Sequence, residues 1–388
     1  MDTIIAMDQQ YVAGTYGRFP VALVSGKGSI VTDVNGKDYI DMGSGIGVTS
    51  FGFADTEWAA AVNAQLNTLQ HTSNLYYTAP CAKLAQLLCQ KTGMSKVFFS
   101  NSGAEANECA IKVARKYSAQ KKGPEYSTII TLKNSFHGRT LTTLAATGQD
   151  HYHELFQPLT PGFVHVEANN IAELQQVVSQ VKAAGILMEC VQGEGGVIGL
   201  DKEFLCAAAQ ICKEQDIPLM IDEVQTGNGR TGKLYAYMHY GISPDIVSTA
   251  KGLGGGLPIG ATLLSEKVQN VLSPGDHGST YGGNPVACAG ALSIIQRLDE
   301  AFLSEVQKKS EYIFTTLAST RNVRAVTGMG LMVGIQTEKP AKDVVAACME
   351  QGVLCLTAKD KVRLLPALNI SWDVLKKAID VIVGACKQ

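Results

Sequence analysis

Apolar runs of strand length alternate with longer stretches of helical spacing through the middle of the chain. The strand candidates cover residues 96–100, 128–132, 162–166, 184–188, 217–221, 246–249 and 261–264. Several of them are apolar throughout, which is typical of a parallel sheet buried on both faces. Residues 104–116, 171–182 and 202–215 repeat apolar positions at helical spacing and are long enough for crossover connections. The pattern predicts an α/β domain with a mostly parallel sheet.

The two ends of the chain follow a different pattern. Residues 24–42 form two short alternating runs around Asn35-Gly36, a dipeptide that favours a tight β-hairpin. A long helix is expected over residues 285–298, and helix, strand and helix elements follow it toward the C-terminus. We therefore expect residues 1–45 to pack with a smaller α+β domain at 297–388, and residues 46–296 to form the large domain.

Composition narrows the classes of function. The chain has 388 residues, of which 46% are hydrophobic and 18% charged, and its net charge is −2 with no basic tract. This balance indicates neither a nucleic-acid groove nor an anionic membrane surface. Ten cysteines lie mostly in apolar runs and form no CxxC pair, so no zinc site or disulfide framework is expected. There is no signal-peptide pattern and no run of 18 apolar residues, and we expect a cytoplasmic protein whose partner is a small molecule or another protein.

Glycine is abundant, with 39 residues, and its most regular motif suggests a nucleotide. The segment Gly227-Asn-Gly-Arg-Thr-Gly232 follows an apolar strand and satisfies GxGxxG, the pattern of nicotinamide enzymes. No acidic residue stands about 20 positions further on, and no helix pattern opens at the third glycine. A phosphate loop of the GxxxxGK type is disfavoured as well, because Leu234 occupies the position of the magnesium-binding Ser or Thr. A nicotinamide oxidoreductase remains one alternative.

A second anion site is suggested where the strand at 96–100 meets the next helix. Ser102 and Glu105 have the spacing of a capping box, and Gly103 lets the backbone come close to a bound group. Free amides and the positive end of the helix dipole would together hold a phosphate. Taken alone, the spacing favours a capped helix start without a ligand.

Two charged residues stand at the ends of apolar strands. Asp222 terminates one strand, and Lys251 follows another immediately before a run of glycines. A buried carboxylate needs a cationic partner, and parallel strands bring their carboxyl ends to one edge, so both residues are expected near Ser102. A phosphate anchor, a buried acid and a strand-end lysine are three requirements of one cofactor, pyridoxal 5′-phosphate.

At this point the chain resembles the class III aminotransferases of fold type I. The resemblance spans nearly the whole length through these segments: NGKDYIDMGSGIGV, NLYYT, SNSGAEANE, FHGRT, QGEGG, IDEVQTGNGRTG, AKGLGGGLPIGA, HGSTYGGNP and RLLPALNI. It implies a large domain with a mostly parallel seven-stranded sheet flanked by helices, plus a smaller α+β domain.

The resemblance also implies roles in holding the cofactor. Lys251 would form the Schiff base, Asp222 would pair with the ring nitrogen, and Gln225 would hydrogen-bond the ring hydroxyl. The remaining cofactor contacts are assigned to Phe136 on the ring face, to Ser102, Gly103 and Ala104 as the phosphate cradle, and to Thr280. Thr280 would complete the cradle of the neighbouring subunit, so a homodimer with shared active sites follows.

Substrate residues follow from the same resemblance. Arg139 would bind the carboxylate remote from the reacting amine, and Arg363 the α-carboxylate of 2-oxoglutarate. Glu194 is similar to the gate that pairs with the second arginine while the amino donor is bound. Tyr16 and Ser279 are also assigned to substrate. The implied reaction is a ping-pong transfer of the δ-amine of N2-acetyl-L-ornithine to 2-oxoglutarate, in which Lys251 is the base.

The resemblance leaves the amino donor open, and two segments of the chain differ from the family pattern. Another class III donor is possible, namely ornithine, succinylornithine, 4-aminobutyrate or N-succinyldiaminopimelate, as is a non-catalytic protein that binds pyridoxal phosphate. Ile46 stands where ornithine-specific relatives carry tyrosine, which favours an acylated donor. The turn at residues 52–56 lacks the usual GHxHP-like sequence, and we expect altered loop packing there without loss of chemistry.

Overall fold

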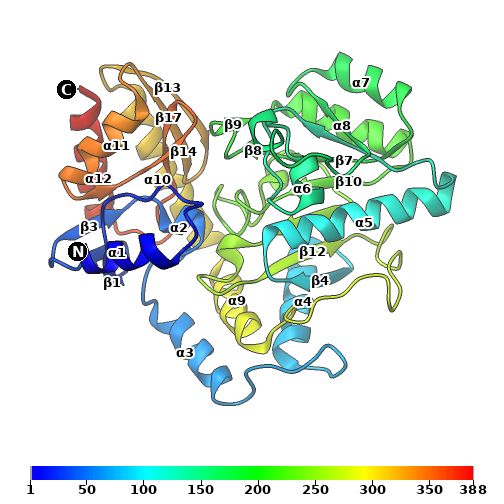
Figure 1. The fold of residues 1–388 in the computed structure, drawn as a ribbon, viewed down its shortest axis with the longest axis horizontal. Coiled ribbons are helices and arrows are strands. Elements are labelled where there is room, and N and C mark those ends of the chain that lie inside the picture. The colour runs from blue at the N-terminus through cyan, green and yellow to red at the C-terminus, as the bar shows by residue number, and fades with distance from the viewer. Residues whose placement is uncertain (1, 388) are drawn as a thin grey trace.

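A computed structural model describes residues 2–387 and is built around one large sheet (Figure 1). The strand order is β4-β12-β11-β10-β7-β5-β6. Strand β12 is antiparallel to both of its neighbours, and the other pairs are parallel, so the predicted mostly parallel sheet is confirmed. The strands are β4 Lys96–Ser100, β5 Thr128–Leu132, β6 Phe163–Val166, β7 Ala183–Glu189, β10 Leu219–Asp222, β11 Ile246–Thr249 and β12 Gly260–Leu264.

Each predicted strand of this sheet overlaps an observed one. The largest shift is at β10, which was expected to begin at residue 217 and begins at Leu219. Pro218 has no N–H to donate to a ladder, and only its carbonyl is used, accepting from the amide of Ile186 at 3.1 Å. The observed strand ends at Asp222, one residue after the expected end at residue 221.

Helices cover both faces of the large sheet. Alternate side chains of β10 point to opposite faces, so Met220 packs with the buried side of α5 (Gly103–Lys122), while Leu219 and Ile221 pack with α8 (Lys202–Glu214). α5 is capped by Ser102 and ends at Gly123, whose φ is 113°. The remaining helices of this part are α3 Thr56–Leu66, α4 Ala79–Thr92, α6 Leu141–Ala146, α7 Ile171–Gln180 and α9 Pro285–Arg297, and η1 Asp150–Tyr152, η2 Ala236–His239 and η3 Lys251–Leu253 are short 3₁₀ turns.

Two smaller sheets lie near the chain termini (Figure 1). The first has the order β1-β2-β3-β15 and contains the predicted hairpin, which turns at Asn35-Gly36 with a φ of 79° at Gly36. Its last strand joins the N-terminal and C-terminal parts of the chain, because β15 pairs in parallel with β3. The strands are β1 Leu23–Lys27, β2 Ile30–Asp33, β3 Asp38–Asp41 and β15 Val353–Leu354.

The second small sheet is antiparallel, with the order β13-β14-β17-β16. Its strands are β13 Val323–Met329, β14 Met332–Thr337, β16 Leu356–Ala358 and β17 Lys361–Leu364, and its helices are α10 Glu300–Ala318, α11 Ala341–Glu350 and α12 Trp372–Lys387. A two-stranded pair, β8 Val191–Gln192 and β9 Ile198–Gly199, and two helices, α1 Asp2–Tyr11 and α2 Ser44–Gly47, complete the elements. The domain boundaries at residues 45 and 296 stay a prediction.

The unusual turn at residues 52–56 is held by contacts of its own. Gly52 has a φ of 76°, and a Cβ there would lie 2.5 Å from the carbonyl oxygen of Gly28. Asp55 caps α3 by accepting from the amide of Trp58 at 2.9 Å, and it pairs with Arg297 at 2.8 Å. Within residues 2–387 no helix is long and apolar enough to cross a membrane, and all ten cysteines are free.

Candidate active site

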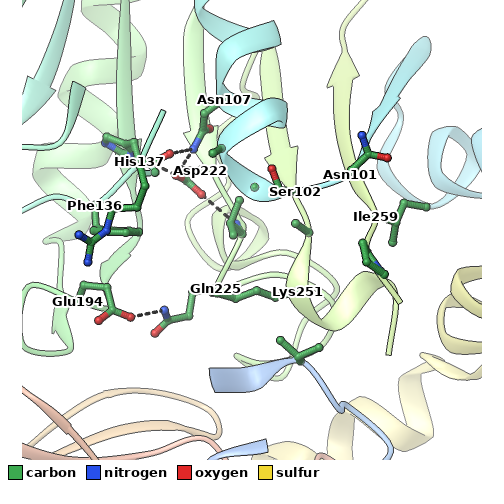
Figure 2. A pocket seen from close by; sticks show the side chains of 18 of the residues that line it. Asn101, Ser102, Asn107, Phe136, His137, Glu194, Asp222, Gln225, Lys251 and Ile259 are labelled. Atoms are coloured by element: carbon green, nitrogen blue, oxygen red, sulfur yellow. Dashed lines mark hydrogen bonds and ion pairs between the residues drawn. The ribbon is translucent and has the colours of Figure 1, made fainter. Parts of the chain in front are cut away.

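A cavity of about 590 Å³ opens at the carboxyl edge of the parallel strands (Figure 2). Asp222 ends β10, Lys251 follows β11, and the loop after β4 leads into α5. The predicted site residues that line the cavity are Tyr16, Ser102, Gly103, Ala104, Phe136, Arg139, Glu194, Asp222, Gln225 and Lys251. Parallel-sheet topology therefore brings together residues that are far apart in sequence.

The start of α5 presents a row of free amides to this cavity. The hydroxyl of Ser102 accepts from the amide of Glu105 at 3.2 Å, as a helix cap should. The carboxylate of Glu105 reaches past Ser102 and accepts from the amide of Asn101 at 2.6 Å. Within the described chain, no acceptor lies on the amides of Ser102, Gly103 or Ala104. These amides and the helix dipole form a cradle for an anion.

Glycine is required in the cradle for steric reasons. A Cβ on Gly103 would lie 2.6 Å from Cγ1 of Val224, in the loop after β10. The backbone of α5 can therefore approach this loop only because residue 103 has no side chain.

Asp222 is buried, with 3% of its surface exposed, and its carboxylate is held by three donors. Oδ1 accepts from the amide of Val224 at 2.9 Å. Oδ2 accepts from Nδ2 of Asn107 at 2.7 Å and lies 2.8 Å from Nδ1 of His137 (Figure 2). A carboxylate only accepts, so Nδ1 of His137 is the donor; Nε2 of that ring is buried and has no partner among residues 2–387.

Lys251 has an unusual backbone and an unpaired amine. Its φ of 44° lies in the left-handed region, which a residue with a side chain rarely adopts. No hydrogen-bond or ion-pair partner of Nζ lies among residues 2–387. Burial lowers the pKa of Lys251, and the nearby charge of Glu194 only partly offsets this effect. A lysine in this setting can act as a neutral amine.

Glu194 lines the cavity and forms an ion pair with Arg363, which is buried behind it and is not one of the lining residues. Nη1 of Arg363 donates to Oε1 of Glu194 at 2.6 Å, and Nε2 of Gln225 donates to the same oxygen at 3.2 Å. Burial alone would raise the pKa of Glu194, but the charge and hydrogen bond of Arg363 outweigh it and hold this pKa below its ordinary value. Arg363 is 3% exposed, and its Nε has no partner within the described chain.

The lining of the cavity also includes an exposed arginine that lies beside two aromatic rings. Cζ of Arg139 lies 4.2 Å from the ring centroid of Tyr152 and 5.5 Å from that of Phe136. Within the described chain Arg139 has no acidic partner, so its guanidinium is available to an anionic ligand. Tyr16 lines the same cavity from the N-terminal segment and is 73% exposed.

Four residues that the sequence singled out do not line this cavity. Arg363 is joined to it through its pair with Glu194. Thr280 is exposed and Ser279 is half-buried, and neither lines this cavity. Ser279 instead accepts from Nδ2 of Asn101 at 3.1 Å. Ile46 lines a neighbouring apolar cavity of about 370 Å³, which shares Tyr16 with the first.

Three buried residues of the site were not predicted from the sequence, namely Asn107, His137 and Glu189. Asn107 is a polar residue on the buried face of α5, between Ala106 and Ala110, and that position is the signal that could have identified it. Glu189 accepts from the amides of Phe136 at 3.0 Å and of Gly193 at 3.1 Å. Burial raises the pKa of Glu189 to about 7. Glu189 therefore links the segment of Phe136 to the segment of Gly193 and Glu194.

The GxGxxG segment does not form a nucleotide site. Residues 227–232 make consecutive turns, and the next element is the short η2 rather than a helix at the third glycine. Arg230 is buried and donates through Nη1 to the carbonyls of Leu331 at 3.1 Å and Pro366 at 2.5 Å. The segment therefore ties the loop after β10 to the C-terminal sheet, and the nicotinamide alternative is wrong.

The fold and the cavity together define the class of protein. An unpaired amine, a buried carboxylate and an amide cradle are the groups that bind an aldehyde, a basic ring nitrogen and a phosphate. The Aminotransferase class-III family model matches residues 11–386, and the chain belongs to that family.

Relatives support this membership over the full length. The chain is 51% identical to acetylornithine aminotransferase of Haemophilus ducreyi, across all of this chain and 99% of that protein. It is 44% identical to acetylornithine aminotransferase of Methanocaldococcus jannaschii, with 99% of this chain and 97% of that protein covered.

Solved structures share the fold. Ornithine aminotransferase from Toxoplasma gondii superposes with a TM-score of 0.95 at 30% identity, covering 100% of this chain and 94% of that one. N-acetylornithine aminotransferase from Stenotrophomonas maltophilia superposes with a TM-score of 0.85 at 32% identity, covering 98% of each chain. The expected fold type I architecture is thereby confirmed.

Proposed function

We propose that this enzyme transfers the δ-amino group of N2-acetyl-L-ornithine to 2-oxoglutarate, giving N-acetyl-L-glutamate 5-semialdehyde and L-glutamate, a step of arginine biosynthesis. Relatives that are 51% and 44% identical to the chain are named for acetylornithine. The geometric observation that carries the proposal is that Glu194, which pairs with the buried Arg363, lines the same cavity as Arg139, an arginine without an acidic partner among residues 2–387. One cavity can then accept a monocarboxylate while the pair is closed and a dicarboxylate when it opens.

The cofactor of this reaction is pyridoxal 5′-phosphate, and the residues present fit it. Its phosphate would lie on the free amides of Ser102, Gly103 and Ala104, where a Cβ on residue 103 has no room. Asp222 would hold a proton at the ring nitrogen, Gln225 would bind the ring hydroxyl and Phe136 would lie on the ring face. When bound, the cofactor supplies an aldehyde that takes up the amino group and a ring that withdraws electrons from the neighbouring carbon.

Within this scheme Lys251 moves the proton. As a neutral amine, Nζ removes a proton from the δ-carbon of the donor, and in the second half of the cycle it returns a proton to the α-carbon of glutamate. Burial lowers the pKa of Lys251 and so favours the neutral form that this task requires. Arg139 binds the remote carboxylate and Arg363, released by Glu194, the α-carboxylate of 2-oxoglutarate. Tyr16 and Ser279 are proposed to contact substrate.

A homodimer would complete each site. Thr280 is exposed and lies off its own cavity, as expected of a residue that serves the phosphate cradle of a second copy. Asn74 donates to the carbonyls of Ser279 and Gly282, so this loop and the neighbouring segment 75–77 are joined. Tyr77 and Tyr281 on these loops are 106% and 62% exposed, which leaves aromatic surface for the second copy. We also propose that the enzyme acts in the cytoplasm, since a reducing compartment keeps cysteines free.

A panel of amino donors with 2-oxoglutarate tests the substrate. We expect the highest kcat/KM for N-acetylornithine, compared with succinylornithine, ornithine, N-succinyldiaminopimelate and 4-aminobutyrate. A preference for free ornithine or 4-aminobutyrate would overturn the donor and leave the reaction class in place.

The lysine is tested separately. Lys251→Ala should abolish turnover and the yellow colour of the lysine-bound cofactor, while the circular dichroism of the protein stays unchanged. A variant that turns over normally would show that another residue moves the proton. A purified wild-type protein that binds pyridoxal phosphate but transfers no amine from any donor would instead indicate a non-catalytic binding protein.

A further inference from the structure

One buried amide side chain is hydrogen-bonded to three separate segments of the cofactor site. Asn107 lies one turn into α5, is 1% exposed and lines the cavity (Figure 2). Nδ2 donates to Oδ2 of Asp222 at 2.7 Å and to the carbonyl of His137 at 2.8 Å. Oδ1 accepts from the hydroxyl of Ser248 at 2.5 Å. These bonds use both donors of the amide and one lone pair of its oxygen.

The three partners belong to different parts of the site. Asp222 ends β10, His137 follows the ring-face residue Phe136, and Ser248 lies on β11 three residues before Lys251. Ser248 and Asp222 are paired in register on neighbouring strands. The first turn of α5, which precedes Asn107, carries the free amides. A single side chain therefore connects the anion cradle, the buried acid and the strand of the lysine.

The chemistry of the contact with Asp222 favours an ionised carboxylate. The donors on Asp222 are Nδ2 of Asn107, the amide of Val224 and Nδ1 of His137. The side-chain amide of Asn107 is a neutral group that keeps its two N–H donors. A donor to the charged form of an acid favours that form. We propose that Asn107 is a positioning residue that keeps Asp222 ionised and oriented toward a protonated ring nitrogen. The proposal rests on the proposed role of Asp222 toward the cofactor.

Two substitutions separate orientation from charge. Asn107→Ala removes the donor and leaves Asp222 with two. Asn107→Asp keeps the size, and its carboxylate can still accept from Ser248, but it places a second acid against Oδ2 of Asp222. Ser248→Ala removes only the bond that orients the amide. The matched control is Ser118→Ala, which removes a buried hydrogen bond of the same helix, 2.9 Å to the carbonyl of Ala184, away from the cavity.

The experiment measures the dissociation constant for pyridoxal phosphate and the pH midpoint of the visible band of the lysine-bound cofactor. We expect Asn107→Ala to weaken binding about 10-fold or more and Ser248→Ala by less. In Asn107→Asp the two neighbouring acids would share one proton, so Asp222 would no longer hold a proton at the ring nitrogen. Without that positive charge nearby, the protonated nitrogen that joins Lys251 to the cofactor is easier to form, and the midpoint should move upward by roughly 1 unit. Ser118→Ala should change neither quantity, although it also lowers the midpoint of urea unfolding.

Each outcome decides the proposal. Binding and pH midpoint that match the wild type in Asn107→Ala and Asn107→Asp would reduce Asn107 to a structural residue. If Asn107→Ala fails to fold, the isosteric Asn107→Asp decides by its midpoint. A wild-type protein without a visible band, or a band that survives Lys251→Ala, would refute the proposed function itself and this inference with it.

Discussion

Removing the carboxylate of Glu194 should destabilise the folded enzyme, because it leaves a buried guanidinium without a counter-charge. In Glu194→Ala, Arg363 keeps only the oxygen of Gln225, at 3.4 Å from Nη1, and its Nε already lacks a partner. Two charges 2.6 Å apart attract by about 6 kcal/mol at an effective dielectric constant of about 20. Much of this attraction offsets the desolvation of the two groups.

Breaking a buried pair from one side costs about 3–5 kcal/mol. The side chain of Glu194 is 25% exposed, so water screens part of the charge and the lower end of that range applies. We expect a loss of about 3 kcal/mol in the free energy of unfolding, measured by urea titration at pH 7 with saturating pyridoxal phosphate. Glu194→Gln, which keeps the acceptor oxygen, should lose less.

The control is an exposed pair of the same length. Lys133 and Glu167 are 2.6 Å apart with side chains 47% and 52% exposed, so Glu167→Ala should cost far less than Glu194→Ala. The pKa of Glu194 lies below its ordinary value of 4.5, so the contribution of the pair is fully present above that pH and is lost as the pH falls below it. The difference between wild type and Glu194→Ala should therefore be constant from pH about 6 to 8. A difference that varies in this window, or that only equals the effect of Glu167→Ala, would refute the reasoning.

Three further substitutions test other parts of the molecule. Burial raises the pKa of Glu223 to about 7, so the wild-type free energy of unfolding should fall as the pH rises toward 7. In urea titrations, Glu223→Gln should remove on the order of 3 kcal/mol of this total fall. Arg230→Lys cannot reproduce the two bonds of Nη1 and should cost about 2 kcal/mol by the same assay. Gly103→Ala should weaken pyridoxal phosphate binding about 10-fold or more in equilibrium dialysis, since its Cβ meets Val224 at 2.6 Å.

Opposite results would be informative in each case. Equal pH slopes for wild type and Glu223→Gln would mean that Glu223 is ionised in the folded state at pH 5. A fully stable Arg230→Lys would mean that the carbonyls of Leu331 and Pro366 find other donors. Normal cofactor affinity in Gly103→Ala would mean that the loop carrying Val224 moves aside.

Local patterns carried most of the fold prediction. The buried strands are short apolar runs between helical segments, and Asn35-Gly36 permits one tight turn, so sequence alone locates these elements to within about two residues at each end. The helix that begins at Gly103 runs on to Lys122, six residues past its predicted end, because its last turns are polar and only Gly123 stops it. The antiparallel direction of β12 was not predicted, because a strand that is apolar throughout has the same residue pattern in a parallel and in an antiparallel arrangement.

The site was predictable only where single residues sit at strand ends or helix starts. Ser102, Asp222 and Lys251 follow apolar runs, so topology brings them to one edge. Arg363 and Glu194 are 169 residues apart, and their pairing came from the family resemblance, because nothing in either segment points to the other. Asn107 and Glu189 act through buried hydrogen bonds to distant backbone and side-chain groups, which a linear pattern does not contain.

The left-handed backbone of Lys251 has a consequence for protein engineering. Its amine has no partner within the described chain that would hold it in place. We infer that the backbone of Lys251, which follows β11 with a φ of 44°, sets the direction of the side chain. The direction of the side chain therefore depends on the backbone, whereas the position of its amine depends on the length of the side chain. A cysteine at position 251 alkylated to a lysine-length amine would point the same way, whereas a shorter amine would share the direction and fall short of the reacting carbon.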